Sequence, residues 1–229
     1  MYFSKVTFIN AREAAQKLVD LNRNGAYASH ALLWALFDHD DGAHFLFREE
    51  EGAVGLPVFY VLSNRLPESS SLFLCESKLY QPRLMAGDRL AFKLRANPTI
   101  SIRDVDGKSR RHDVLMHAKK QVDTTGMSPQ EAHDAKNAAA LQAGTAWLAN
   151  HQRLAGWGIQ LDSEPVIDIE SYRQQKLFQP KNKHHIQFSS VDYQGLLTVS
   201  DSAHFLEALS NGVGRAKGFG CGMWMIRRI

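Results

Sequence analysis

The segment QPRLMAGDRLAFKLR (residues 81–95) separates two halves of the sequence that follow the same pattern. Pro82 and Gly87 interrupt regular structure, and residues 89–95 then alternate apolar and mostly charged side chains as a β-strand does. Each half is long enough to form a domain with its own core. We therefore predict an N-terminal domain over residues 1–81 and a C-terminal domain over residues 88–229.

The first half predicts the order strand, helix, strand, strand, helix, strand. Residues 2–9 are apolar or β-branched at most positions, which indicates a strand. Residues 11–21 and 26–37 place apolar side chains at helical spacing on either side of the break at 22–25. Strands follow at 44–48 and 57–62, and residues 67–81 suggest a short helix and then a strand near 78–80. This order is the ferredoxin-like plan.

The second half repeats this order without detectable sequence identity to the first. Residues 99–115 predict a hairpin that turns at Asp106-Gly107. The helix predicted from Ser128 to about Leu154 begins with an N-cap serine and a first-turn proline. The remaining predicted elements are strands at 166–169, 176–178, 186–191, 196–199 and 223–226 and a helix at 202–209. The fold class is therefore α+β, with two tandem ferredoxin-like (RRM-like) domains and antiparallel sheets.

Composition indicates an ordinary soluble globular protein. The chain has 229 residues, of which 44% are hydrophobic and 22% charged, so it is not an intrinsically disordered class of sequence. No apolar run is long enough for a membrane helix and the start does not resemble a signal peptide, so we expect a cytoplasmic protein. Cys75 and Cys221 are too few for a disulfide framework or a cysteine zinc site, and we expect both to be reduced.

Charge is unevenly distributed along the chain. The net charge is +3, but residues 1–77 carry −4, residues 78–120 carry +7, residues 121–171 carry −5 and residues 172–229 carry +5. If folding brings the two basic blocks together, they form a surface for a polyanion. The alternative is two separate charged loops in solvent.

The sequence GVGRAKGFGCG (residues 212–222) holds five glycines and two cations between a predicted helix and the last strand. Glycine permits positive φ angles and a close approach of the backbone to a ligand, and exposed amides beside Arg215 and Lys217 suit a phosphate backbone. The loop has neither the ending of a Walker loop nor the placement of a dinucleotide fingerprint. A simple turn is the alternative.

Three segments together resemble the CasE family of CRISPR repeat-RNA processing endoribonucleases, of type I-E. These are the opening MYFSKV (residues 1–6), the run FKLRANPT (residues 92–99) and the glycine pattern of residues 212–222. The resemblance spans the chain and implies two tandem ferredoxin-like domains. It also implies a metal-independent endoribonuclease without cofactors, which cleaves precursor CRISPR RNA at its repeat hairpin and stays bound to the product.

The resemblance places the catalytic residues in Tyr27-Ala28-Ser29-His30, because family members carry a Tyr-x-x-His motif on the first helix. The spacing puts Tyr27 and His30 on one helical face. RNA supplies its own nucleophile, the 2′-hydroxyl, so the protein needs only to align it and move protons. His30 is the expected principal acid/base group, since an imidazole titrates near neutral pH, and Tyr27 assists. Ala35 stands where some relatives have a basic residue, and Lys5 or the glycine-rich loop is the expected substitute.

The resemblance also implies that a basic hairpin of the second domain, here Arg173 to His185, enters the groove of the RNA stem. The complete set of expected RNA-binding residues is Lys5, Lys93, Arg95, Arg173, Lys176, Lys181, Lys183, Gly212, Gly214, Arg215, Lys217, Gly220 and Gly222. The expected partners are the CRISPR repeat RNA stem-loop and the other subunits of the type I-E surveillance complex, and the free protein is expected to be a monomer. The alternative function is a non-catalytic subunit that binds the RNA hairpin.

Overall fold

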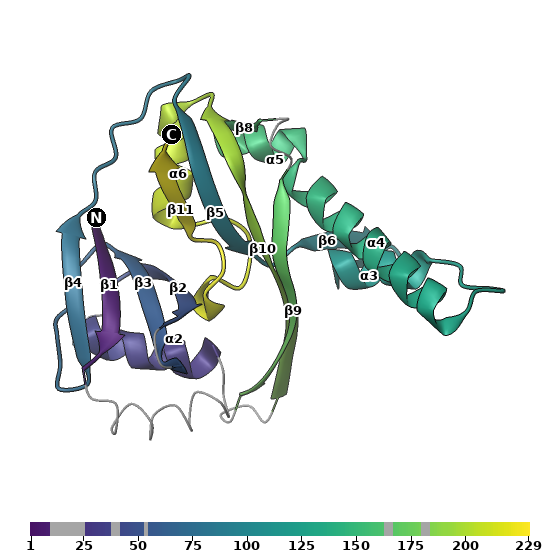
Figure 1. Cartoon of the computed structure of the whole chain (residues 1–229), viewed down its shortest axis with the longest axis horizontal. Coiled ribbons are helices and arrows are strands. Elements are labelled where there is room, and N and C mark those ends of the chain that lie inside the picture. Colours follow the sequence, from purple (N-terminus) through teal and green to yellow (C-terminus); the bar gives the residue numbers. More distant parts are fainter. Residues whose placement is uncertain (10–25, 38–41, 53–54, 163–166, 180–183) are drawn as a thin grey trace. The chain divides into compact units, whose positions relative to one another are not determined.

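The computed structural model describes residues 1–9, 26–37, 42–52, 55–162, 167–179 and 184–229. The chain forms two compact units (Figure 1). The first comprises residues 1–84, 176–187 and 206–224, and the second comprises residues 85–175, 188–205 and 225–229. The glycine-rich loop therefore lies in the first unit, although chain order had put it in the C-terminal domain. Because each unit combines separate segments, the limits 1–81 and 88–229 stay a prediction.

The first unit is built on a four-stranded sheet with the order β2-β3-β1-β4. Its strands are β1 (Tyr2–Phe8), β2 (Phe45–Glu51), β3 (Pro57–Ser63) and β4 (Phe73–Leu79). All three pairings are antiparallel. The first and third strands in chain order lie in the middle, as the ferredoxin-like plan requires. The short helix expected after residue 67 is absent from the described residues 64–72, which connect β3 to β4 as irregular backbone.

Helix α2 (Ala26–Trp34) packs on one face of this sheet and continues as a 3-10 turn, η1 (Ala35–Phe37). The helix is rich in Ala and Leu, which favour helical backbone. Leu33, Leu36 and Phe37 join a buried cluster with side chains of the sheet, among them Val6 and Phe59. The expected helix over residues 26–37 is thus confirmed, and the expected helix over 11–21 lies outside the described residues.

The second unit repeats the strand arrangement, with the order β11-β5-β10-β8 and β9 paired to β10. Its strands are β5 (Arg89–Ala96), β8 (Ile159–Leu161), β9 (Asp168–Gln179), β10 (His184–Val199) and β11 (Trp224–Arg228). Again the first and third strands of the plan, β5 and β10, are central. The four short strands expected between residues 166 and 199 are two long ones, since β9 continues through residues 170–175 and β10 through residues 192–195.

The helices of this unit are α3 (Val114–Gln121), α4 (Pro129–Leu148), α5 (His151–Gly156) and the first residues of α6 (Ser202–Asn211). Ser128 and Glu131 form the capping box that begins α4. The long helix expected to reach Leu154 breaks at Ala149, because the side chain of Asn150 accepts a hydrogen bond from the Arg153 amide and caps α5. None of the helices in the described ranges is long and apolar enough to cross a membrane.

A separate two-stranded sheet, β6 (Thr99–Arg103) and β7 (Ser109–Asp113), forms the predicted hairpin. Gly107 has a φ of 75° in the turn, which suits glycine. Asp104 stabilises the turn by accepting hydrogen bonds from the amides of Asp106 and Lys108. Asp113 then caps α3 by accepting from the Met116 amide.

Candidate functional site

His30 lies on α2 against the edge strand β2. Its ring stacks on Phe45 at a centroid distance of 5.3 Å and lies 6.2 Å from Phe47 and 6.1 Å from Trp34. Trp34 also contacts Phe45 edge-on at 5.3 Å. Since His30 and Trp34 are four residues apart, one side of α2 holds both rings over the same strand. Rings from α2 therefore pack against the β2 side chains at this point.

The imidazole is half-buried, and this burial lowers the pKa of His30 below its ordinary value of 6.5, since removal from water disfavours the charged ring. The backbone of Gly218 lies beside the ring, since a Cβ added to Gly218 would be 3.8 Å from His30 Nε2. One ring nitrogen therefore faces the glycine-rich loop. A neutral imidazole in this position can exchange a proton with a ligand bound along the loop.

The glycine-rich loop passes around the edge of β2 (Figure 1). A Cβ on Gly212 would lie 2.8 Å from Leu46 Cδ1, whereas a Cβ on Gly220 would lie 3.3 Å from Phe47 Cε2. Leu46 and Phe47 are consecutive in β2, so their side chains point to opposite faces of the sheet. The loop therefore contacts both faces, and only residues without side chains fit so close to the strand.

The loop conformation depends on left-handed backbone at several positions. The φ angles are 66° at Gly212, 70° at Gly214, 79° at Gly220 and 87° at Gly222, a region that glycine adopts without strain. Ala216 shares it with a φ of 59°, at the start of the 3-10 turn η4 (Lys217–Phe219). The amide of Val213 donates to the carbonyl of Gly222 at 2.9 Å and closes the loop at its base.

The two cations of the loop differ in their surroundings. Lys217 Nζ donates to the carbonyl of Asn211 at 2.8 Å and to that of Gly212 at 3.4 Å. These carbonyls end α6, and a lysine there satisfies acceptors that the helix leaves unpaired. Arg215 is exposed. Lys217, an expected RNA-binding residue, therefore holds the loop together, and Arg215 is the loop cation that solvent reaches.

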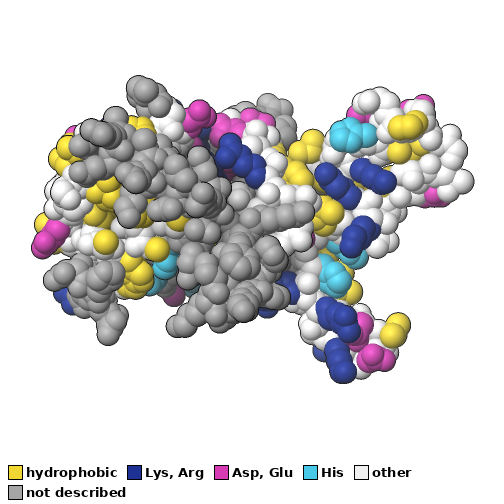
Figure 2. Space-filling model, turned by 90° about the horizontal axis from the view of Figure 1, so that it is seen from below, with side chains coloured by type: hydrophobic (Ala, Val, Ile, Leu, Met, Phe, Trp, Pro, Cys, Tyr) yellow, Lys and Arg dark blue, Asp and Glu magenta, His cyan; other side chains and the backbone are white. Residues whose placement is uncertain are grey.

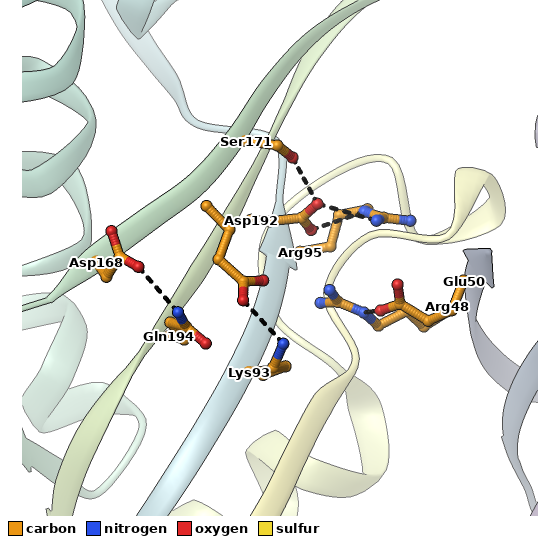
Figure 3. Close-up of polar contacts among 9 residues, drawn as sticks. Arg48, Glu50, Lys93, Arg95, Asp168, Ser171, Asp192 and Gln194 are labelled. Atoms are coloured by element: carbon orange, nitrogen blue, oxygen red, sulfur yellow. Dashed lines mark hydrogen bonds and ion pairs between the residues drawn. The ribbon is translucent and has the colours of Figure 1, made fainter.

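Two acidic residues that the sequence analysis did not select lie beside the helix and strand of the site. Ser29, fully buried, donates to Glu49 Oε2 at 2.6 Å. Arg48, also buried, donates through Nε to Glu50 (Figure 3). The signal in the sequence was the run Arg48 to Glu51, an unusual density of charge within a strand.

Three other expected RNA-binding residues are engaged in ion pairs. Lys5 lies 3.7 Å from Glu76, and Lys93 Nζ lies 2.9 Å from Glu170. Arg95 binds both carboxylate oxygens of Asp192, at 2.8 and 2.9 Å (Figure 3). The Arg95 pair is largely buried, with side-chain exposures of 15% and 8%. Lys5 belongs to the first unit, and Lys93 and Arg95 belong to the second.

The remaining expected residues are only partly described. Tyr27 lies in α2, but its side chain is outside the described part of the structure. The side chain of Lys176 in β9 and the whole of Lys181 and Lys183 are likewise outside it. Arg173 is exposed on β9. The expected basic hairpin from Arg173 to His185 therefore corresponds to the end of β9 and the start of β10, and the side chains of residues 176–186 are outside the described part of the structure.

A second basic surface, which we call the β6–β7 surface, covers the small hairpin and α3. Most of its cationic side chains are exposed, as the burial of β7 shows. Lys and Arg side chains gather with histidines on this part of the second unit in Figure 2. His112 and His117 lie 5.8 Å apart between their ring centroids. The members are Arg103, Lys108, Arg110, Arg111, His112, His117 and Lys120.

Within the described residues, no three side chains of His, Cys, Asp or Glu gather as a metal site requires. Asp38 to Asp41, whose composition could suit a metal, lie outside those residues.

Comparison with known proteins gives consistent matches over the whole chain. The model of a family described as CRISPR associated protein matches residues 1–228. The chain is 28% identical to the CRISPR system Cascade subunit CasE of Escherichia coli (strain K12), covering 97% of each chain. The crystal structure of the CRISPR-associated protein Cas6e from E. coli K-12 is 25% identical, with a TM-score of 0.66 over 100% of both chains.

A further solved structure has the same fold. It is Thermus thermophilus Cse3 bound to an RNA that represents a pre-cleavage complex, with 24% identity and a TM-score of 0.67, covering 99% of this chain and 98% of that one. The ferredoxin-like organisation predicted from the sequence is thereby confirmed.

Proposed function

Since the chain belongs to the CRISPR associated protein family, we propose that it is an endoribonuclease that cleaves precursor CRISPR RNA at the hairpin of its repeat. The similar E. coli protein is a subunit of Cascade, and the similar T. thermophilus structure holds RNA in a pre-cleavage complex. After cleavage the protein keeps its product and joins the type I-E surveillance complex. It works in the cytoplasm, together with the transcripts it cleaves, and is a monomer before it joins the complex.

One observation supports the chemical part of this proposal above all: His30 Nε2 faces Gly218. A titratable ring and exposed residues of the glycine-rich loop, Gly214, Arg215 and Gly218, thus belong to one compact unit. Arg215 suits a phosphate, and the ring suits proton transfer beside it.

The proposed reaction needs no metal. The 2′-oxygen attacks the neighbouring phosphorus, the bond from phosphorus to the 5′-oxygen breaks, and the products are a 2′,3′-cyclic phosphate and a 5′-hydroxyl. The 2′-hydroxyl loses a proton and the 5′-oxygen gains one. His30 exchanges a proton with this centre and Tyr27 is its partner on the same helix, a role worth roughly 10² to 10⁴ in rate for a general acid or base.

RNA binding is assigned to exposed cations. Arg215 and Arg173 remain candidates, and the β6–β7 surface adds a further cationic hairpin that suits the phosphates of an A-form stem. Lys93 and Arg95, which are held by Glu170 and Asp192, contribute less than the sequence analysis expected.

The test is cleavage of the cognate repeat hairpin in EDTA. The expected result is one cut by wild-type protein, none when the nucleotide 5′ of the scissile phosphate is a 2′-deoxynucleotide, and a loss of at least 10²-fold in rate for His30→Ala with RNA affinity retained. Binding without cleavage by the wild type would instead identify a non-catalytic hairpin-binding subunit. Cleavage of the deoxy substrate would disprove the 2′-hydroxyl as nucleophile.

A further inference from the structure

We propose that Ser29 and Glu49 form a positioning pair that fixes the catalytic helix α2 on strand β2 and so sets the place of the His30 ring. This inference rests on the proposed function. Neither residue was selected from the sequence, and neither is proposed to touch RNA or the reacting atoms.

Ser29 directly precedes His30, and its hydroxyl donates to Glu49 Oε2 at 2.6 Å. Glu49 lies two residues beyond Phe47 in β2, and Phe47 two beyond Phe45, so the three side chains share one face of the strand. That face carries α2, because Phe45 and Phe47 contact His30. The helix therefore crosses the strand with its first turns over Glu49 and its last turn over Phe45.

Two kinds of contact join α2 to β2 along this crossing. At the end of α2, His30, Trp34 and the following Phe37 all lie within 5.3 Å of the Phe45 ring, centroid to centroid. Apolar ring contacts are not strongly directional, and they permit a helix to slide or tilt by a fraction of an ångström. A hydrogen bond to a carboxylate is directional and short. Among the described contacts of α2 with β2, it is the Ser29 bond that has this property.

Ser29 is fully buried, and a buried hydroxyl without an acceptor is costly. Alanine or leucine would serve this position as well if it only filled space in the core. The serine with its carboxylate partner therefore specifies a particular position of the helix. Because His30 is the next residue on the same helix turn, this position also fixes where its ring lies. A displacement near 1 Å in a catalytic group costs on the order of 10²-fold in rate.

The test uses the full-length protein and compares Ser29→Ala, Glu49→Met, Glu49→Gln and the double variant Ser29→Ala/Glu49→Met. Gln keeps an acceptor oxygen for the serine and Met does not. Ser4→Ala is the matched control, because Ser4 is fully buried and its hydroxyl bonds Ser77 at 2.8 Å between β1 and β4, neither of which pairs with β2. Single-turnover rate constants and dissociation constants are measured with the repeat hairpin RNA.

The expected result is a rate constant about 10- to 100-fold lower for Ser29→Ala and Glu49→Met, with the dissociation constant changed by less than about twofold. Glu49→Gln stays within about threefold of wild type, and the double variant is no slower than the slower single variant, since both remove the same bond. The proposal is overturned if Ser29→Ala and Glu49→Met cleave as fast as Ser4→Ala. It is also overturned if the rate loss of the double variant equals the product of the two single losses, or if Glu49→Gln is as slow as Glu49→Met.

A second measurement separates this inference from the proposed activity. The NMR resonances of the His30 ring are shifted by the Phe45 ring beneath it, and they can be assigned by their absence in His30→Ala. We expect them to move in Ser29→Ala and Glu49→Met but not in Glu49→Gln or Ser4→Ala. If the wild type does not cleave RNA, the proposed function is wrong, but the shifts of the His30 resonances still support the positioning pair. If these resonances are unchanged in Ser29→Ala, the positioning pair is disproved.

Discussion

The His30 ring combines a role in proton transfer with a site that resists its protonation. Its ring is half-buried on Phe45, and burial lowers its pKa from 6.5. At neutral pH the free protein therefore carries a neutral imidazole, ready to accept a proton. Binding of a phosphodiester beside it adds negative charge, which favours the charged ring again and couples substrate binding to proton uptake.

We predict that His30 of the free protein titrates with a lowered pKa. In the free protein its NMR resonances should show a pKa below 6.5, and Phe45→Ala, which opens the ring to water, should raise that pKa toward 6.5. Because the folded protein binds this proton less tightly than the unfolded chain, stability should fall as pH decreases from 6.5 through the lowered pKa. A His30 pKa at or above 6.5 in the free wild type contradicts the prediction.

At the level of elements, the glycine-rich loop contains glycines that its conformation requires and one glycine, Gly218, that lies beside the His30 ring. Gly212 combines a φ of 66° with a contact of 2.8 Å to Leu46 for any added Cβ. Gly218 has neither constraint, and its Cβ would meet only His30, at 3.8 Å from Nε2. Substitution of Gly212 therefore tests the stability of the loop, whereas substitution of Gly218 tests the space beside His30.

We predict that Gly212→Ala lowers the free energy of unfolding by about 1–3 kcal/mol, through backbone strain and overpacking. Gly218→Ala should leave the unfolding midpoint within about 1 °C and yet reduce the rate of RNA cleavage at least 10-fold, because its methyl group fills the space beside the imidazole. Gly156→Ala, where an added Cβ meets nothing within 4 Å, is the control for both. Equal cleavage by Gly218→Ala and wild type would show that the reacting phosphate lies elsewhere.

For Lys217, too, an effect on protein stability can be distinguished from an effect on RNA binding. Its ammonium group satisfies carbonyls at the end of α6, so Lys217→Met should destabilise the protein by about 1 kcal/mol. It should leave the dependence of RNA affinity on salt unchanged, because no phosphate contact is lost. Titrations at several salt concentrations check this, and a slope reduced by about one unit would return Lys217 to the RNA-binding residues.

The elements also show what the sequence could predict. Strand β1 was found because most of its residues are apolar or β-branched, and β5 because its apolar and mostly charged residues alternate. Helix α4 was found because Ser128 and Pro129 are local signals of a helix start. Strand β10 was split into two because Asp192 and Gln194 interrupt its apolar pattern. Asp192 is compatible with a central strand only because Arg95 neutralises it from β5, which it pairs with in register. Such a partner 97 residues away leaves no local signal.

The site was predictable to the same extent. The catalytic assignment of His30 followed from a resemblance and the glycine-rich loop from its composition, but their contact and the contribution of Glu49 required the fold. Counting cations could not distinguish those that an acidic side chain neutralises from those that solvent reaches. This distinction matters most at the scale of the whole molecule, where binding of a polyanion depends on the total of available charges.

A final prediction compares two arginines of the second unit. Arg111 is exposed on β7 within the β6–β7 surface, whereas Arg95 is held by both oxygens of Asp192. If the β6–β7 surface binds the RNA stem, Arg111→Ala should weaken binding and reduce the slope of log affinity against log salt by about one unit. It should leave the free energy of unfolding unchanged within about 0.5 kcal/mol, as for most surface substitutions.

Arg95→Ala should give the opposite result, because it leaves the largely buried carboxylate of Asp192 without its main counter-ion. The free energy of unfolding should fall by about 3 kcal/mol, with the salt slope of the folded protein unchanged. Denaturant unfolding and RNA titrations at 50 to about 300 mM salt measure both quantities for each variant. A reduced slope for Arg95→Ala together with an unchanged slope for Arg111→Ala would mean that the RNA follows the face of the sheet and not the β6–β7 surface.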